Sequence, residues 1–417
     1  MTDKHLSTES YKGVRDFYPQ DMAGQRYIFD TWAKTAESFG FERYDASILE
    51  PAELYKAKGA ENEEMVNEQT YTFIDRGERE VTLRPEMTPT VARMVAGKRR
   101  ELSFPVRWYS IPNLFRYERP QRGRLREHWQ LNCDIFGAND VAADVEIIAL
   151  AHQLLLDFGA KPEMFKIRIN HRGALNAFLA HNSITDEVQV RAVTNVIDRK
   201  AKISASEFAI AMEAAAGKPL SLPETTPEEV AHVIDGLIAL GITNAEYDPS
   251  IVRGFDYYTG TIFEIFDVSG ENNRSMLGGG RYDNLTGMFG GEMISGIGFG
   301  MGDVTMRDFL ETHKLLPESL SATGPEVMVI PMEAEFNLAG QALASTLRRA
   351  TTARVATDIS TKKLGRKIGD ASDRQVRFVI VIGENEVTSQ TFTIKDLRSG
   401  EETTGALAII ENIVHNR

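Results

Sequence analysis

The chain of 417 residues carries a formal net charge of −13, with 42% hydrophobic and 26% charged residues, which is ordinary for a globular protein of two or three domains. No apolar run approaches the ~20 residues of a membrane span. The first residues lack the apolar core of an export signal, so we expect a cytoplasmic protein with no membrane contact. Cys133 is the single cysteine, which excludes an internal disulfide framework and a cysteine-based zinc site, and we expect no metal site.

The N-terminal part of the chain predicts two helices with strands between them. The first helix places Trp32 and Ala36 on one apolar stripe, with Asp21 as its N-cap and Gly40 past its end. The second is expected from residue 141 to residue 158. Strand patterns between the two lie at residues 70–75, 80–85, 105–111, 113–118 and 128–136.

The rest of the chain predicts three further blocks. Residues 170–245 are predominantly helical and interrupted at 217–227, which is typical of an insertion or subdomain. A strand pattern returns at 259–269. Residues 315–325 have the composition of a linker. Beyond the linker, strands alternate with helices, which predicts a small α/β domain of about 90 residues.

Positive charge is concentrated in one short stretch of this acidic chain. Five arginines fall within eleven residues: Arg116, Arg119, Arg122, Arg124 and Arg126. The flanking segments alternate polar and apolar side chains, so two antiparallel strands joined by this loop would place four polar groups on one surface: Arg116, Glu118, Gln130 and Asp134. Guanidinium groups suit phosphate oxygens, which predicts a polyanion at the loop. The alternative is a solvated basic hairpin.

Two other segments carry candidate binding residues. In residues 82–89, Arg84, Glu86 and Thr88 alternate, and a carboxylate there could hold a substrate ammonium; the alternative is an exposed strand edge. In residues 252–265, Tyr257 and Tyr258 offer an aromatic wall with hydroxyl donors, or else a packed turn.

Ten glycines lie between residues 278 and 302. The spacing fits neither a Walker A loop nor a dinucleotide-binding fingerprint. In the last part, glycines alternate with Ile297, Phe299 and Met301, so one strand face is bare. This face could form a floor for a flat ligand, or the glycines could be required by a crowded sheet.

Together these motifs resemble those of the class II aminoacyl-tRNA synthetases, and within them the histidyl-tRNA synthetases. Residues 12–19 ("KGVRDFYP") look like the opening signature of that family, 115–137 are similar to its motif 2, and 278–302 to its motif 3. Residues 253–264 ("RGFDYYTGTIFE") resemble its histidine-specific signature. The resemblance spans nearly the whole chain, and the conjunction of motifs is highly specific.

The resemblance implies an α+β catalytic core with an antiparallel sheet, a helical insertion and a C-terminal α/β anticodon-binding domain. We expect the core to comprise residues 1–168 and 248–316, the insertion 169–247, and the anticodon-binding domain 325–417. The implied activity is ATP-dependent ligation of L-histidine to tRNA(His) through histidyl-adenylate, with Mg²⁺ on the phosphates. Motif 1, which builds a homodimer interface in the family, would be residues 40–55. Its customary proline is replaced by Ser47.

The resemblance also assigns roles to individual residues. The histidine pocket would contain Glu86, Thr88, Arg116, Gln130, Asp134, Arg253, Tyr257 and Tyr258. ATP would be bound by Arg116, Glu118, Arg124 and Arg253, of which Arg116 and Arg253 would be catalytic. One departure concerns motif 3, where the family has an arginine that packs on the adenine and reaches the γ-phosphate. Thr305 stands there, and Arg307, two residues later on a helix, should point elsewhere. Either another arginine substitutes or ATP is held differently.

The C-terminal domain offers a basic helical face of Lys362, Lys363, Arg366 and Lys367, which suits an anticodon stem or, alternatively, is solvated. A different function is also open, because the histidine-sensing regulatory subunit of ATP phosphoribosyltransferase resembles the synthetase core without making adenylate. The missing motif 3 arginine favours that alternative. The histidine signature, the arginine loop and the C-terminal domain argue against it.

Overall fold

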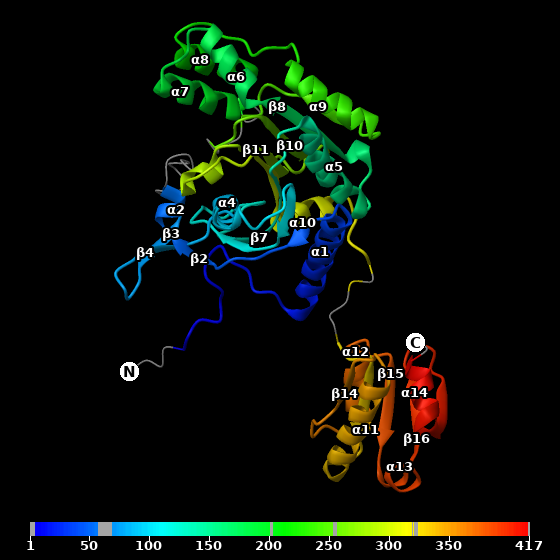
Figure 1. Ribbon diagram of the computed structural model, residues 1–417. Coiled ribbons are helices and arrows are strands. Elements are labelled where there is room, and N and C mark those ends of the chain that lie inside the picture. Colours follow the sequence, from blue (N-terminus) through cyan, green and yellow to red (C-terminus); the bar gives the residue numbers. More distant parts are fainter. Residues whose placement is uncertain are drawn as a thin grey trace. The chain divides into compact units, whose positions relative to one another are not determined.

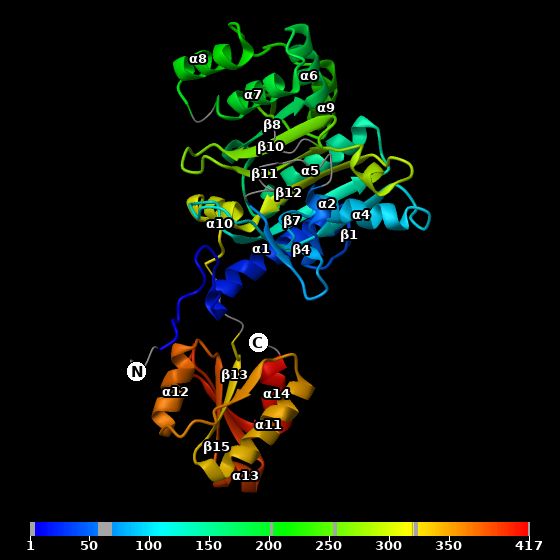
Figure 2. The same ribbon diagram turned by 90° about the vertical axis from the view of Figure 1, so that its left-hand side faces the viewer.

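The computed structural model describes residues 5–56, 69–200, 203–252, 257–318, 320 and 324–415. The chain forms two compact units (Figures 1 and 2). Unit 1 comprises Met1–Tyr18 and Gly24–Glu318, and unit 2 comprises Pro19–Ala23 and Ser319–Arg417. The division near residue 318 falls within the stretch expected to be a linker.

Unit 1 is built on a nine-stranded, largely antiparallel sheet. Along the sheet the strands are β1 (Glu42–Arg43), β5 (Val106–Ser110), β7 (Glu127–Phe136), β12 (Gly296–Gly302), β11 (Ser275–Arg281), β10 (Thr261–Asp267), β8 (Phe165–His171) and β9 (Ala245–Tyr247), with β6 (Asn113–Phe115) paired to β7. The six strands from β5 to β8 are antiparallel neighbours, and only β1 and β9 add in parallel at the edges. This confirms the expected α+β core.

Four helices bury the main hydrophobic core against one face of this sheet. They are α1 (Pro19–Ser38), α5 (Val141–Asp157), α9 (Glu228–Ala239) and α10 (Asp303–Thr312). Trp32 and Ala36 are fully buried in this core, as the helical stripe predicts. The N-cap prediction for Asp21 is wrong: the helix already begins at Pro19, a residue well suited to the first helical position because it has no N–H to leave unpaired.

The opposite face of the sheet carries α4 (Thr88–Lys98) and the short helix η3 (Leu285–Phe289), which pack on Phe136 and Ile262. Next to α4, the strands β2 (Leu49–Pro51), β4 (Glu80–Leu83) and β3 (Tyr71–Ile74) form a separate three-stranded sheet beside the short helix α2 (Glu53–Lys56). The pocket described below lies on this face.

The helical region after β8 has two parts. Helices α6 (Arg172–His181), α7 (Glu187–Asp198) and α8 (Ala205–Ala216) share their own small core, whereas α9 belongs to the main core. Gly236 explains how α9 approaches α5 so closely, because a Cβ there would lie 2.6 Å from Val145 Cγ2. The turn η1 (Pro162–Met164) leads into β8.

Unit 2 is an α/β sandwich with the strand order β14 (Val355–Thr357), β13 (Val327–Pro331), β15 (Phe378–Ile382), β16 (Thr391–Asp396) and β17 (Glu402–Ala406). Its helices are η4 (Ala334–Phe336), α11 (Asn337–Ala350), α12 (Leu364–Asp373), α13 (Glu384–Ser389) and α14 (Leu407–His415). Along β13, Val327 and Val329 pack towards α11 and α14, while Met328 and Ile330 pack towards α12. No helix of the described residues in either unit is long and apolar enough to cross a membrane.

Candidate active site

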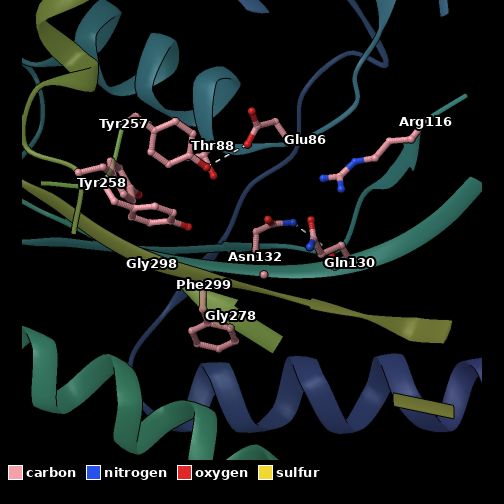
Figure 3. Close-up of a pocket in the computed structure, with 12 residues that line it drawn as sticks. Glu86, Thr88, Arg116, Gln130, Asn132, Tyr257, Tyr258, Gly278, Gly298 and Phe299 are labelled. Carbon is pink, nitrogen blue, oxygen red and sulfur yellow. Dashed lines mark hydrogen bonds between the residues drawn. The ribbon is translucent and has the colours of Figure 1, made fainter. Parts of the chain in front are cut away.

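A polar pocket lies where β7, β11 and β12 are covered by the segments leading into α4 and β10 (Figure 3). Chain segments far apart in sequence supply its walls: Glu86, Thr88, Arg116, Gln130, Asn132, Tyr257, Tyr258, Gly278, Tyr282, Gly298, Phe299 and Gly300. The sheet therefore brings together motifs that the sequence separates by more than 200 residues.

Most of the histidine-binding residues expected from the sequence meet in this pocket. The lining includes Glu86, Thr88, Arg116, Gln130, Tyr257 and Tyr258. Asp134 lies just behind the lining and accepts a hydrogen bond from Tyr282, which does line it. Arg253 lies outside the described residues. Asn132 and Tyr282 were not singled out from the sequence.

The glycines of β12 make room for the polar side chains of β7. In the antiparallel register Gly298 pairs with Asp134 and Gly300 with Asn132. A Cβ on Gly298 would collide with the Asp134 carboxylate and lie 2.6 Å from the Cys133 carbonyl oxygen, and one on Gly300 would lie 2.7 Å from Gln130 Cδ. The bare strand face is thus covered by Asp134 and Gln130, so crowding within the sheet explains these glycines.

Tyrosine rings form one end of the pocket. The centroids of Tyr257 and Tyr258 are 4.9 Å apart, and the Tyr257 ring packs edge-on against Tyr282 at 6.0 Å. The Tyr257 hydroxyl donates to Glu86 Oε2 over 3.0 Å, which positions a buried carboxylate beside the aromatic wall.

Asp134 is a buried carboxyl group with an unusual proton affinity. Burial raises its pKa to about 7, and the hydrogen bond from Tyr282 only partly offsets this effect. Its neighbour Cys133 points to the opposite, apolar face of β7, where burial raises the pKa of the thiol well above its usual value. Strand β7 therefore separates a pocket that contains an ionisable carboxyl group from the hydrophobic core.

One arginine beside the pocket holds its wall in place, and another faces the pocket. Arg84 is buried and donates to the carbonyl oxygens of Ala46, over 2.8 Å, and Asn113, over 3.0 Å. The alternative of an exposed strand edge at this segment is therefore wrong. Arg116 donates through Nε to the Pro85 carbonyl oxygen over 2.9 Å, which orients its guanidinium at the end of the pocket away from the tyrosines (Figure 3).

The arginine loop between β6 and β7 is folded against unit 1. Arg126 donates to the Glu118 carbonyl oxygen over 3.1 Å and lies 4.1 Å from the ring centroid of Tyr117. Arg124 Nε lies 2.5 Å from Glu118 Oε2 in an ion pair. Burial, together with nearby arginines led by Arg116, lowers the pKa of His128 to about 3, so this imidazole is neutral.

The opening signature is joined to the same site through Asp303, at the start of α10. Its buried carboxylate accepts hydrogen bonds from Arg15 over 2.7 Å, from Gln25 over 2.8 Å and from the Trp129 backbone N–H over 2.9 Å. The signature residue Arg15 is thereby fixed next to β7. This supporting role was not predicted from the sequence.

Thr305 provides no cation to the site. Its hydroxyl donates to the carbonyl oxygens of Met276, over 3.1 Å, and Gly302, over 3.2 Å. As expected, Arg307 points elsewhere, because its guanidinium donates to Gln25 on α1 over 3.2 Å.

The basic residues around α12 differ in their exposure. Lys362 and Arg366 are exposed but both pair with Asp370, at 2.5 Å and 2.8 Å, while Lys363 is exposed at the N-cap of the helix. Lys367 was expected on the basic face but is buried, because its ammonium donates to the Pro331 carbonyl oxygen over 2.9 Å.

The two units correspond to the two parts of an aminoacyl-tRNA synthetase. Residues 13–224 and 220–303 match a family model described as histidyl-tRNA synthetase, and residues 326–417 match one described as an anticodon-binding domain. These matches define the class of the protein, an aminoacyl-tRNA ligase.

Similar proteins specify the family within that class. A histidine–tRNA ligase from Leptospira biflexa is 42% identical, with 97% of this chain and 96% of the relative covered, and one from Thermoplasma volcanium is 36% identical, with 95% and 96% covered. The crystal structure of histidyl-tRNA synthetase from Nostoc sp. PCC 7120 superposes with a TM-score of 0.78 at 25% identity, covering 99% of this chain and 100% of that one. The chain belongs to the histidyl-tRNA synthetase family.

Proposed function

We propose that the protein activates L-histidine with ATP and transfers it to tRNA(His). One observation carries the proposal: a pocket with a buried carboxylate and tyrosines at one end and the Arg116 guanidinium at the other adjoins the arginine loop (Figure 3). An amino acid carries groups that are complementary to the two ends of this pocket. Its side chain would lie on Tyr257 and Tyr258, its ammonium near Glu86 and Thr88, and its carboxylate towards Arg116.

In the first step the histidine carboxylate attacks the α-phosphorus of ATP, which forms histidyl-adenylate and releases pyrophosphate. A carboxylate is already ionised at neutral pH, so this nucleophile needs no general base. Catalysis then rests on alignment and on stabilising charge at the phosphoryl oxygens. Arg116 and Arg253 are the proposed catalytic residues, with Glu118 and Arg124 binding the rest of ATP.

Mg²⁺ is proposed to arrive with ATP as its phosphate complex. Magnesium is bound mainly by phosphate oxygens and water in such sites. Among the residues that the structure describes, no group of three or more His, Cys, Asp or Glu side chains could hold a metal ion. We treat the magnesium as part of the substrate because phosphate oxygens and water supply most of its ligands.

Selectivity for histidine would come from polar partners for both imidazole nitrogens. Tyr257, Tyr258 and Tyr282 surround the proposed ring position, and Asp134 and Glu86 are each hydrogen-bonded to one of them. A site built from buried hydrogen-bonding groups rejects analogues that leave those groups unpaired.

In the second step a ribose hydroxyl of the terminal tRNA adenosine, the 3′-OH in class II enzymes, would attack the activated carbonyl. We propose residues 1–168 and 248–316 as the catalytic core, 169–247 as the insertion near the acceptor stem, and 325–417 as the anticodon-binding domain. Within the insertion, α9 and β9 pack with the core. In that domain Lys362, Lys363 and Arg366 remain the candidate RNA contacts, since their side chains are exposed.

A regulatory subunit that only senses histidine is the second candidate, and Thr305 in place of the motif 3 arginine is the observation in its favour. The match of residues 326–417 to an anticodon-binding model argues for the synthetase. So does the coverage of 96% of the Leptospira ligase by this chain.

Histidine-dependent ATP–pyrophosphate exchange with the purified protein tests the proposal. We expect exchange in the wild type and its loss, by roughly a hundredfold or more, in Arg116→Ala and Arg253→Ala, with far-UV circular dichroism unchanged. Wild-type protein that binds histidine but never exchanges pyrophosphate would establish the regulatory alternative.

A further inference from the structure

Thr305 leaves the phosphate end of the proposed site without the cation that motif 3 usually supplies. Its hydroxyl is bonded to backbone oxygens, and Arg307 is bonded to α1. A different guanidinium lies beside this position. It belongs to Arg274, the residue immediately before β11.

Gly123, in the middle of the arginine loop, shows where the Arg274 side chain lies. Gly123 has a φ of +73°, and a Cβ placed on it would be 2.9 Å from Arg274 Cδ and 3.5 Å from Thr305 Cγ2. Side chains from positions 274 and 305 therefore converge on one point of the loop. An arginine at position 305 would compete for the space that Arg274 fills.

The segment that carries Arg274 is fixed at both ends. Asp267, at the end of β10, accepts hydrogen bonds from Asn272 over 2.7 Å and from His313 over 2.9 Å. Arg122 of the arginine loop donates to Asn272 Oδ1 over 3.1 Å, which ties the two loops together. Arg274 is thus presented by a preorganised segment, as a ligand-binding side chain requires.

The charges around Arg274 favour an added anion. Arg274 is half-buried and makes no hydrogen bond or ion pair with the described residues. Burial and the nearby Arg124 guanidinium lower the pKa of Arg274, and Glu118 opposes them. Glu118 is already paired with Arg124. Two guanidinium groups sharing one carboxylate leave an excess of positive charge, which a triphosphate would neutralise.

We propose that Arg274 binds the distal phosphates of ATP and takes the place of the arginine that Thr305 replaces. The inference rests on the proposed function, because ATP is the anion that the proposed reaction brings to this loop. With Arg124, Arg274 forms a clamp on the β- and γ-phosphates that orients pyrophosphate as the leaving group. Because Gly123 has no side chain, the loop does not collide with the side chain of Arg274.

Steady-state pyrophosphate exchange with Arg274→Gln tests this role. We expect the KM for ATP to rise about 10- to 100-fold, the range for losing a charge-assisted hydrogen bond, and the KM for histidine to change by less than about twofold. Arg307→Gln is the matched control, because it removes the same charge from a side chain that points to α1. An unchanged KM for ATP in Arg274→Gln, in an otherwise active protein, overturns the proposal.

Two further measurements locate the contact. In titration calorimetry Arg274→Gln should weaken ATP binding but leave AMP binding unchanged, and an equal loss for both nucleotides rejects the phosphate assignment. The double variant Arg274→Ala with Thr305→Arg should bind ATP more tightly than Arg274→Ala alone. No gain would contradict a shared position for the two side chains. Wild-type protein without exchange activity would instead reject the proposed function itself.

Discussion

Arginine has two kinds of task in this site. Arg84, Arg126 and Arg281 are structural: each donates to backbone oxygens, and Arg281 also pairs with Asp144. Arg116 lines the pocket, although its Nε also donates to the Pro85 carbonyl oxygen, and the side chain of Arg274 lies beside Gly123 of the arginine loop. Within the run at residues 116–126, Arg126 organises the loop, so the number of arginines in the run overstates the charge that a ligand meets.

The buried Asp134 should make stability depend on pH. Its pKa is 3.8 as a free side chain and about 7 in the fold. Between these values the folded state binds the extra proton, so the contribution of Asp134 to stability is fully present below about pH 4 and is lost as pH rises to about 7. The decline should be on the order of 2–4 kcal/mol. Asp134→Asn cannot ionise and should lack this decline.

Urea unfolding at pH 5 and pH 8, followed by tryptophan fluorescence, measures the difference. All three tryptophans, Trp32, Trp108 and Trp129, lie in unit 1, so the signal reports on the unit that contains Asp134. The stability of the wild type relative to Asp134→Asn should fall between the two pH values. A parallel pH dependence of the two proteins would assign the decline to other groups.

The pocket residues that the sequence identified belong to recognisable local motifs. Glu86 precedes a helix, Gln130 alternates along a strand, and Tyr257 lies in a signature. Tyr282 and Arg274 were missed because nothing local distinguishes them. Tyr282 follows a strand of glycines, and only the sheet order brings its hydroxyl to Asp134, 148 positions earlier. Arg274 was missed because only the fold places its side chain and that of Thr305 beside Gly123.

At the scale of elements, apolar alternation was the reliable signal. It predicted β5, β7 and β10, whose inner faces are buried in large clusters. The same alternation is present in β8, where Phe165, Ile167 and Ile169 are buried, so that strand could have been found. The two- and three-residue strands β1 and β9 could not, because their pairing depends on the edge strands they join.

The small sheet of β2, β4 and β3 has an exposed apolar face. The register places Leu49 and Tyr71 on either side of Leu83, and Pro51 and Phe73 on either side of Val81. Leu49 and Phe73 are 48% and 47% exposed. Monomeric proteins rarely leave such a face uncovered. Since β2 lies in the expected motif 1, we propose that a second copy of the chain covers it, as a homodimer.

Substitution on this face tests the dimer. Wild-type protein should sediment with twice the chain mass, and Phe73→Asp should lower the mass towards that of one chain, because a buried unpaired charge opposes association. Thr72→Asp is the control, since Thr72 is exposed on the other face of the same strand. A wild type that is monomeric at micromolar concentration would exclude the interface.

At the scale of the whole molecule, each unit has a hydrophobic core of its own. The alternation of strands and helices after residue 325 predicted the α/β class of the second unit and its elements from β13 to β15. The later elements α13, β16, β17 and α14 were not predicted. The basic face on α12 was less predictable. Burial of Lys367 depends on the Pro331 carbonyl at the end of β13, which no pattern in the helix reveals.

Because each unit has its own hydrophobic core, adenylate formation and tRNA charging can be tested separately. A chain ending at residue 324 should retain histidine-dependent pyrophosphate exchange within about threefold, because the proposed adenylate site lies wholly in unit 1. Its kcat/KM for tRNA charging should fall by roughly tenfold or more, since phosphate contacts to the anticodon stem are lost. Equal losses in both assays would count against an anticodon role for residues 325–417.

Cys133 lies on the dry side of the strand whose other side carries Gln130 and Asp134, and it is the only thiol in the chain. Oxidants and alkylating reagents attack the thiolate, which burial both hides and disfavours here. Oxidation or alkylation of the Cys133 thiol therefore requires that β7 first separate from the sheet. Oxidation of this thiol would follow the collapse of the pocket rather than cause it.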